Sequence, residues 1–265
     1  MCLPRLHLPK PVGNLDEILA LFEPISLKEM DGVKLMNRSD TKFMFSLDTL
    51  ESVLREIAPQ YRVLEIAGVR QGRYETLYYD TPDFYFYRRH HSGKKNRYKV
   101  RKRSYVDSHL AFLEVKFKSN KDRTIKDRTK LADEHIHESL EAESLDFIRN
   151  NAELELSLEP KMWNSFKRIT LVNRFAPERL TIDCGLSFRH GEETVSLPNL
   201  VIAEVKQERR NRNSPVMAAL KKRLIRPESI SKYCLGVAML VKSQKNNGFK
   251  EKLMNIRKIE HGMVA

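Results

Sequence analysis

Alternation of polar and apolar residues, the pattern of a strand with one buried face, recurs along most of this chain. It is clearest over residues 97–105 and 110–118, whose four-residue connection fits a hairpin. Residues 61–80 predict a second hairpin, because they are rich in β-branched and aromatic residues and contain Gly68 and Gly72 as turn residues. Further extended runs cover residues 38–45, 168–175, 179–187 and 195–206.

Helical spacing is confined to short segments between these strands. Ser46 is a predicted N-cap, and the apolar residues after it fall on one stripe: Leu47, Leu50, Leu54 and Ile57. Other predicted helices cover residues 14–22, 140–148 and 160–166, and one begins at Ser214-Pro215. The sequence lacks the regular strand–helix alternation of a parallel sheet, so it favours a mostly antiparallel sheet or barrel with peripheral helices.

The length and composition fit one folded domain. The 265 residues are 41% apolar with only 10 Gly and 11 Pro, which allows a packed core and argues against disorder. No linker divides the chain. We expect a single domain over residues 1–265, with an N-terminal helix at about 14–30, the sheet or barrel at about 35–210 and C-terminal helices at about 214–260.

Targeting signals are not evident in the sequence. No apolar run approaches the roughly 18 residues of a membrane span. The first residues are interrupted by Pro4, Pro9 and Pro11 and lack the apolar region of a secretory signal. The three cysteines lack the C-x-x-C spacing of a zinc site or a disulfide framework. We therefore expect a cytoplasmic protein without a membrane span.

The positive charge is concentrated in one stretch. Residues 88–130 hold 16 Lys or Arg and four acids, a balance of +12, whereas the whole chain carries a formal +13. Most of the excess therefore comes from the two clearest strands and their surroundings. Such a concentration predicts a polyanionic partner.

Strand periodicity sorts these charges onto one face. Lys99, Arg101 and Arg103 project to one side of their strand, and in the next strand Glu114 and Lys116 share a face with Lys118. A sheet with its charged face in water would account for the alternation. Rows of like charge on neighbouring strands repel, however, so the crowding favours a face that an anion neutralises. If that face lined a barrel, it would form a basic tunnel whose carboxylates could hold a divalent cation against phosphate.

Seven segments carry a recognisable pattern, in this order: Arg38-Ser39-Asp40-Thr41-Lys42-Phe43, Tyr78-Tyr79-Asp80-Thr81-Pro82, Tyr98-Lys99-Val100-Arg101-Lys102-Arg103-Ser104-Tyr105, Leu113-Glu114-Val115-Lys116-Phe117-Lys118, Arg179-Leu180-Thr181-Ile182-Asp183, Glu204-Val205-Lys206 and Ser231-Lys232-Tyr233-Cys234. In this order, and over roughly residues 35–240, they resemble the vacuolar transporter chaperone (VTC) domain family. The family is similar to the triphosphate tunnel metalloenzymes, also called CYTH-like proteins. The resemblance implies an α+β fold with a closed antiparallel β-barrel, peripheral helices and a basic bore that binds triphosphate with a metal ion.

The resemblance also implies a function and a set of site residues. The function is a polyphosphate polymerase-like phosphotransferase that moves the γ-phosphate of ATP to a growing polyphosphate chain with Mn²⁺ or Mg²⁺. The catalytic residues would be Lys42, Arg101, Arg103 and Lys232. Substrate would be bound by Arg38, Lys99, Lys116, Lys118, Lys126, Arg128, Arg168, Arg179, Lys206 and Ser231. The metal ligands would be Glu204 and, more weakly, Glu114.

Two other functions stay open at this stage. One is a metal-dependent tripolyphosphatase or nucleoside triphosphatase, which the Arg38-x-Asp40-x-Lys42 strand disfavours because the cleaving enzymes carry Glu-x-Glu-x-Lys there. The other is a non-catalytic polyphosphate-binding protein. A specific nucleic-acid partner is not expected, because the basic run at 209–212 has no interleaved aromatic residue.

Overall fold

The computed structural model describes residues 15–31, 39–121, 123–152, 157–208 and 214–263. The strands in these ranges are β1 (Glu23–Ile25), β2 (Ser39–Ser46), β3 (Tyr61–Leu64), β4 (Gly72–Asp80), β5 (Arg97–Tyr105), β6 (Leu110–Lys118), β7 (Thr124–Lys130), β8 (Glu159–Asn173), β9 (Glu178–His190), β10 (Glu193–Leu197) and β11 (Leu200–Gln207). The helices are α1 (Leu15–Leu19), α2 (Leu27–Asp31), α3 (Leu47–Ile57), α4 (Tyr85–His91), α5 (Ala142–Asn151), α6 (Pro215–Lys222), α7 (Lys232–Leu240) and α8 (Lys250–Glu260).

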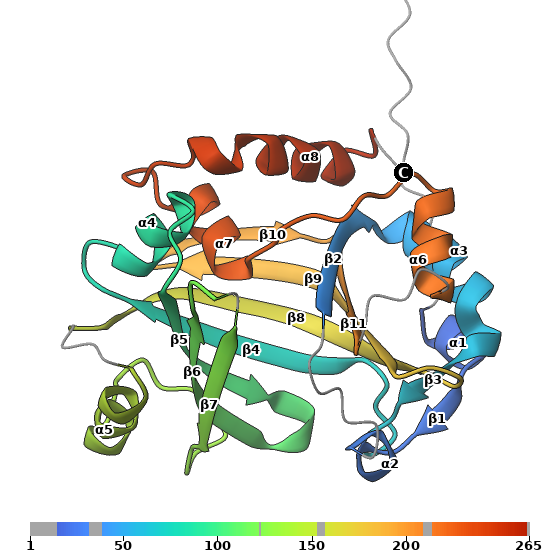
Figure 1. Cartoon of the computed structure of the whole chain (residues 1–265), viewed down its shortest axis with the longest axis horizontal. Coiled ribbons are helices and arrows are strands. Elements are labelled where there is room, and N and C mark those ends of the chain that lie inside the picture. Colours follow the sequence, from blue (N-terminus) through green and yellow to red (C-terminus); the bar gives the residue numbers. More distant parts are fainter. Residues whose placement is uncertain (1–14, 32–38, 122, 153–156, 209–213, 264–265) are drawn as a thin grey trace, which may run out of the picture.

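The strands form one curved sheet with helices around it (Figure 1). The main path runs β2-β11-β9-β8-β4-β5-β6-β7, with antiparallel neighbours throughout, as the alternation predicts. The path ends at β2 and β7, and within the described ranges these two strands are not paired with each other. The antiparallel sheet with peripheral helices is thus confirmed, whereas closure of the sheet into a barrel is not.

The second edge of β2 lies beside another segment of the chain. The backbone N–H of Glu228, between α6 and α7, donates to the carbonyl oxygen of Lys42 at 2.8 Å. Figure 1 shows this connection running past β2. A covered edge offers fewer free backbone groups to another chain.

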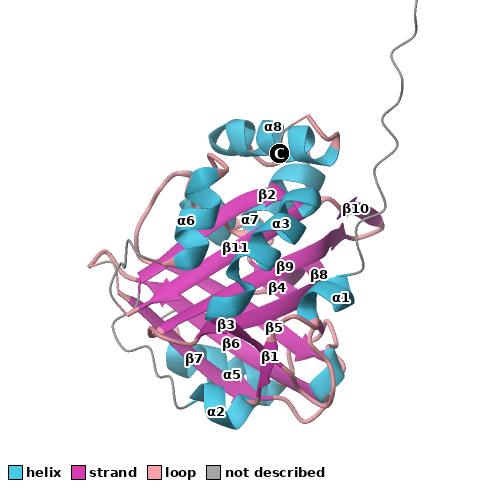
Figure 2. Cartoon of the chain, turned by 90° about the vertical axis from the view of Figure 1, so that its right-hand side faces the viewer, coloured by secondary structure: helices cyan, strands magenta, loops and turns pink. Residues whose placement is uncertain are grey.

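Helices cover the outer face of the sheet (Figure 2). On β2 and β11, Phe43, Phe45 and Val205 pack in one buried cluster with Leu50 and Leu54 of α3. A second outer cluster lies between β4, β5 and β6 and helix α5. None of the described helices combines the length and apolar character needed to cross a membrane.

Helix α7 fills one end of the opposite, inner face. Its buried residues join Met44, Met162, Phe188 and Ile202 from the sheet in an apolar cluster. Gly236 allows this approach, because a Cβ atom there would lie 2.8 Å from both Met162 Sδ and Phe188 Cδ1. That end is therefore packed with apolar side chains.

The N-terminal segment is not one helix. Instead of a helix over 14–30, the chain forms α1, the short strand β1 and α2. Pro24 within β1 has no N–H for a helical hydrogen bond. The side-chain hydroxyl of Ser26 then bonds Glu29, as a cap does at the start of a new helix.

The predicted hairpin over 61–80 is wrong. Strands β3 and β4 do not pair with each other; both pair with β8, β3 opposite Leu171–Asn173 and β4 opposite Glu159–Arg168. Between them only Ile66 and Val69 form an isolated bridge. The 15-residue length of β8 provides room for both partners end to end.

The predicted helix over 160–166 is also wrong, because these residues belong to β8. Pro160 lies next to the first residue of the strand, a place where the missing N–H is tolerated. Met162, Asn164 and Phe166 are buried in strand alternation. The predicted strand over 195–206 is interrupted after Leu197, so that β10 and β11 are separate strands.

Candidate functional site

The inner face of the sheet carries the charged positions of the central strands. The strand register places Arg101 opposite Glu114 and Glu204 opposite Lys42. The intervening residues point outward; Lys102, for example, is 2% exposed and its Nζ donates to the carbonyl oxygens of residues 137 and 139 under the covering loop. The alternation predicted from sequence therefore separates the lysines and arginines of the inner face from those that point outward.

Glu114 on β6 is held by two cations. Arg101 approaches it with Nε at 2.7 Å and Nη2 at 2.6 Å, and Lys126 of β7 forms the second ion pair. Burial opposes ionisation, but Arg101, Arg103 and Lys126 outweigh it and lower the pKa of Glu114 to about 2. Glu114 is a buried carboxylate that stays charged at neutral pH.

Asp183 on β9 has the same arrangement. Arg168 of β8 binds both of its oxygens, at 2.6 and 2.8 Å, and Lys232 at the start of α7 forms a second ion pair. Burial alone would raise the pKa of Asp183, yet Arg168 and Lys232 hold it well below its ordinary value. A bidentate pair fixes the guanidinium plane.

Glu204 on β11 is the third carboxylate of this kind. Lys42 of β2 lies 3.2 Å from its Oε1, and Lys206 lies 2.6 Å from its Oε2. Against the effect of burial, Lys206 and Lys42 lower the pKa of Glu204 far below its ordinary value. Three inner-face carboxylates are thus each neutralised by two cations.

Three further cations on the inner face have no carboxylate within 4.0 Å among the described residues: Lys99, Arg103 and Lys116. Lys99 Nζ donates to Ser231 Oγ at 3.0 Å, and Arg103 Nε donates to Thr76 Oγ1 at 3.1 Å. Burial, together with neighbouring cations, lowers the pKa of all three, and that of Lys116 falls to about 8. These groups form an unbalanced positive cluster.

The cations of distant strands face the same space. The pKa of Lys116, on β6, responds to the charges of Glu204 on β11 and Lys42 on β2, which lie at the other end of the strand path. Likewise, the pKa of Arg103 on β5 responds to Arg168 on β8. The inner face therefore curls until its two flanks approach each other.

Aromatic rings orient the guanidinium groups. The Arg168 guanidinium carbon lies 5.0 Å from the centre of the Tyr74 ring and 5.2 Å from that of Phe166, and Arg101 lies 5.9 Å from Tyr78. Sequence reasoning did not select these rings. It also missed Asp183 as a site residue, although strand alternation in the sequence puts Arg179, Thr181 and Asp183 on one face.

The other predicted site residues take various positions. Arg128 lies on the exposed edge strand β7, and its guanidinium carbon is 4.8 Å from the centre of the Phe112 ring on β6. Ser231 Oγ caps α7, accepting from the backbone N–H of Cys234. Arg179 lies opposite Lys206 in the sheet, and Lys118 opposite Arg97. Arg38 and the basic run at 209–212 lie outside the described residues.

The two predicted metal ligands are carboxylates of the inner face. Glu204 and Glu114 are ionised oxygen donors on the inner face, as Mg²⁺ and Mn²⁺ require. The described residues contain no cluster of three or more His, Cys, Asp or Glu side chains able to hold a metal by themselves. A divalent cation at Glu204 would take the place of the Lys42 or Lys206 ammonium group on the carboxylate and complete its coordination with phosphate oxygens and water.

The chain is similar to two solved structures and to one family model. A candidate adenylate cyclase from Bacillus halodurans is 12% identical, with 74% of this chain and 96% of that chain covered and a TM-score of 0.45. A candidate adenylyl cyclase from Hippeastrum, described as having a dominant triphosphatase activity, is 10% identical, with 76% and 96% covered and a TM-score of 0.44. No curated protein matches. A family model described as the VTC domain matches residues 37–241.

Proposed function

This chain belongs to the VTC domain family, and from that premise and its inner face we propose that it is a metal-dependent polyphosphate polymerase. It transfers the γ-phosphate of ATP to a lengthening polyphosphate chain, with the inner face as a basic bore. In this proposal the flanks at β2 and β7 close the bore around the substrate.

One observation carries the proposal. Glu114, Asp183 and Glu204 already have two cations each, so Lys99 and Lys116 add positive charge that no described carboxylate within 4.0 Å balances. Burial makes this excess costly in the free protein. A bound polyanion offsets that cost, because it places negative charge beside Lys99 and Lys116, which lie opposite each other on β5 and β6.

The residue types suit phosphoryl transfer. That reaction asks little covalent chemistry of the protein and depends on positioning and on neutralising the charge of the transferring group. Arg101 and Arg103 are planar donors that bind phosphate oxygens in fixed geometry, whereas Lys99 and Lys116 carry compact charges on flexible side chains, which tolerate a moving chain. A divalent cation at Glu204, with Glu114 as the second candidate, would supply further neutralisation of phosphate oxygens when bound.

Product analysis tests the reaction. Purified protein incubated with ATP and Mn²⁺ should form ADP and long polyphosphate, visible by gel electrophoresis and ³¹P NMR. Orthophosphate as the sole phosphate product would instead assign the hydrolase. Tight polyphosphate binding with no turnover under any divalent metal would assign the non-catalytic binder.

A pair of lysine variants links the activity to the inner face. Lys116→Ala should weaken tripolyphosphate binding about tenfold, since a charged hydrogen bond is lost. Lys167→Ala is the matched control, because Lys167 is an exposed lysine of β8. Equal affinities of the two variants would place the anion elsewhere.

A further inference from the structure

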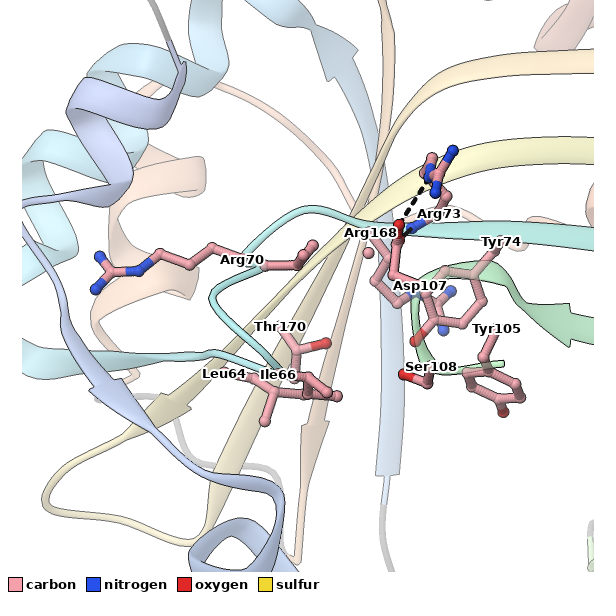
Figure 3. Close-up of a pocket in the computed structure, with 12 residues that line it drawn as sticks. Leu64, Ile66, Arg70, Arg73, Tyr74, Tyr105, Asp107, Ser108, Arg168 and Thr170 are labelled. Atoms are coloured by element: carbon pink, nitrogen blue, oxygen red, sulfur yellow. Dashed lines mark hydrogen bonds and ion pairs between the residues drawn. The ribbon is translucent and has the colours of Figure 1, made fainter. Parts of the chain in front are cut away.

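A cleft opens at the end of the inner face that lies away from α7 (Figure 3). Gly72, the first residue of β4, lines it, whereas Asp80, the last residue of β4, bonds Tyr233 of α7. Apolar side chains fill the α7 end, whereas the cleft lies at the opposite end of the inner face.

Part of the cleft wall is apolar and aromatic, beside the polar side chains of Arg70, Arg73, Asp107, Ser108, Arg168 and Thr170. Leu64, Ile66 and Val69 line one side and Tyr74 and Tyr105 another, as Figure 3 shows for the labelled residues. The two tyrosine rings lie 4.9 Å apart between centres. All five side chains are only partly buried, so they leave a water-exposed apolar surface beside a strongly polar one.

The cleft and the paired cations of the inner face share one residue. Arg168 lines it and also binds Asp183 at 2.6 Å, so one guanidinium belongs to both places. Along β5 the inward positions are Lys99, Arg101, Arg103 and then Tyr105, spaced by about 7 Å. A ligand along this strand therefore meets cations first and an aromatic wall at its outer end.

We propose that this cleft binds the nucleobase of a nucleoside triphosphate whose phosphates lie along the inner face. The inference rests on the proposed function and adds a specificity site to it. An inorganic phosphate chain would leave the apolar wall in water, whereas a nucleobase has a flat apolar face that stacks on tyrosine. Ser108 at the cleft contributes a hydroxyl able to bond the polar edge of the base or the ribose.

The test compares two ligands that share the triphosphate and differ in the base. Dissociation constants of ATP and of tripolyphosphate, each with Mn²⁺, are measured by isothermal titration calorimetry for the wild type, Tyr105→Ala, Tyr105→Leu and Tyr105→Phe. ATP should bind the wild type roughly tenfold more tightly than tripolyphosphate, a stacking contribution that Tyr105→Ala removes. Tyr105→Phe should keep the preference, because it keeps the ring.

The controls separate this proposal from the proposed function. Phe175→Ala removes an aromatic ring that is 80% exposed and outside the cleft, and should change neither constant. Tyr105→Leu fills similar apolar volume, so it shows loss of stacking if Tyr105→Ala does not fold. Equal binding of ATP and tripolyphosphate by the wild type, or equal weakening of both by Tyr105→Leu, overturns the nucleobase cleft and leaves the triphosphate site standing. Binding of neither ligand overturns both.

Discussion

At the scale of single residues, Lys116 ties the charge of the inner face to pH. Burial and the neighbouring cations Lys99 and Arg101 lower its pKa to about 8, so Lys116 is protonated at pH 7 and neutral at pH 9. A bound phosphate favours the protonated form. Tripolyphosphate affinity should therefore fall about tenfold as the pH rises from 7 to 9, which calorimetry at three pH values measures.

A substitution isolates Lys116 from other titrating groups. Lys116→Arg keeps its charge at every pH in this range, because a guanidinium is not deprotonated. The part of the pH dependence that comes from Lys116 should disappear in this variant, and protonation of the ligand contributes equally to both proteins. Identical pH profiles for wild type and variant would contradict the assignment.

Glu204→Gln tests the leading metal ligand. The amide keeps the size of the side chain but loses the negative charge that a divalent cation needs. The Mn²⁺ concentration for half-maximal turnover should rise at least about tenfold and the rate should fall, while thermal unfolding shows a folded protein. Unchanged turnover and an unchanged metal response would remove Glu204 from the ligands.

The residue types on the inner face were predictable, but their pairing was not. Alternation in the sequence placed Lys99, Arg101 and Arg103 on one face, and the register confirms it. The sequence could not reveal that Asp183 joins Arg168 to Lys232, because these residues come from three distant elements. Only the folded sheet brings them within hydrogen-bond distance.

At the scale of the elements, two adjacent residues of β5 should respond in opposite ways. Lys102→Met removes a buried ammonium group that holds the outer loop, so it should lower the free energy of unfolding by about 2 kcal/mol and leave tripolyphosphate binding unchanged. Arg103→Met removes an inner-face cation without an ion pair among the described residues, so it should weaken binding and leave stability nearly unchanged. Urea unfolding and calorimetry measure both effects.

Lys102 and Arg103 are neighbours in β5, and their side chains point to opposite faces of the sheet. The pair therefore compares the two faces at one place along the chain. If Lys102→Met weakened binding as much as Arg103→Met, the alternation of β5 would not separate structure from ligand binding. A loss of stability from both variants would show that the inner cations also hold the fold together.

Asp80 connects three elements at the end of β4. Its carboxylate accepts from the backbone N–H groups of Phe86 and Tyr87 in α4, at 2.8 and 2.9 Å, and from the Tyr233 hydroxyl of α7 at 2.5 Å. Asp80→Ala leaves these buried donors unsatisfied and should cost about 3 kcal/mol in urea unfolding. Asp83→Asn, at an exposed ion pair, should change stability by less than about 1 kcal/mol.

Alternation and turn residues in the sequence predicted strand pairing correctly where the paired strands are also neighbours along the chain. Residues 97–105 and 110–118 pair with each other as the hairpin β5–β6. The same reasoning failed at β3 and β4, because their common partner β8 lies far along the chain, with Tyr61 opposite Asn173 and Gly72 opposite Arg168. It failed at Pro160 because a proline fits the first turn of a helix and the start of a strand equally well.

At the scale of the whole molecule, most of the formal charge of +13 comes from residues 88–130, which include the neighbouring strands β5, β6 and β7. This self-repulsion is part of the cost of folding, and a bound polyanion relieves it. Tripolyphosphate at about 100 times its dissociation constant should stabilise the protein by about 2.7 kcal/mol and raise the unfolding midpoint by about 5 to 10 °C. Differential scanning calorimetry at low ionic strength measures the shift.

Salt separates this effect from general anion binding at the surface. Raising NaCl to about 1 M shortens the Debye length to about 3 Å, which screens exposed charges far more than buried ones. The shift should shrink but persist in the wild type, and should be nearly lost at both salt concentrations in a Lys99→Ala, Lys116→Ala double variant. An equal shift in the double variant, abolished by salt, would mean that the anion binds the outer surface and that the inner face is not the site.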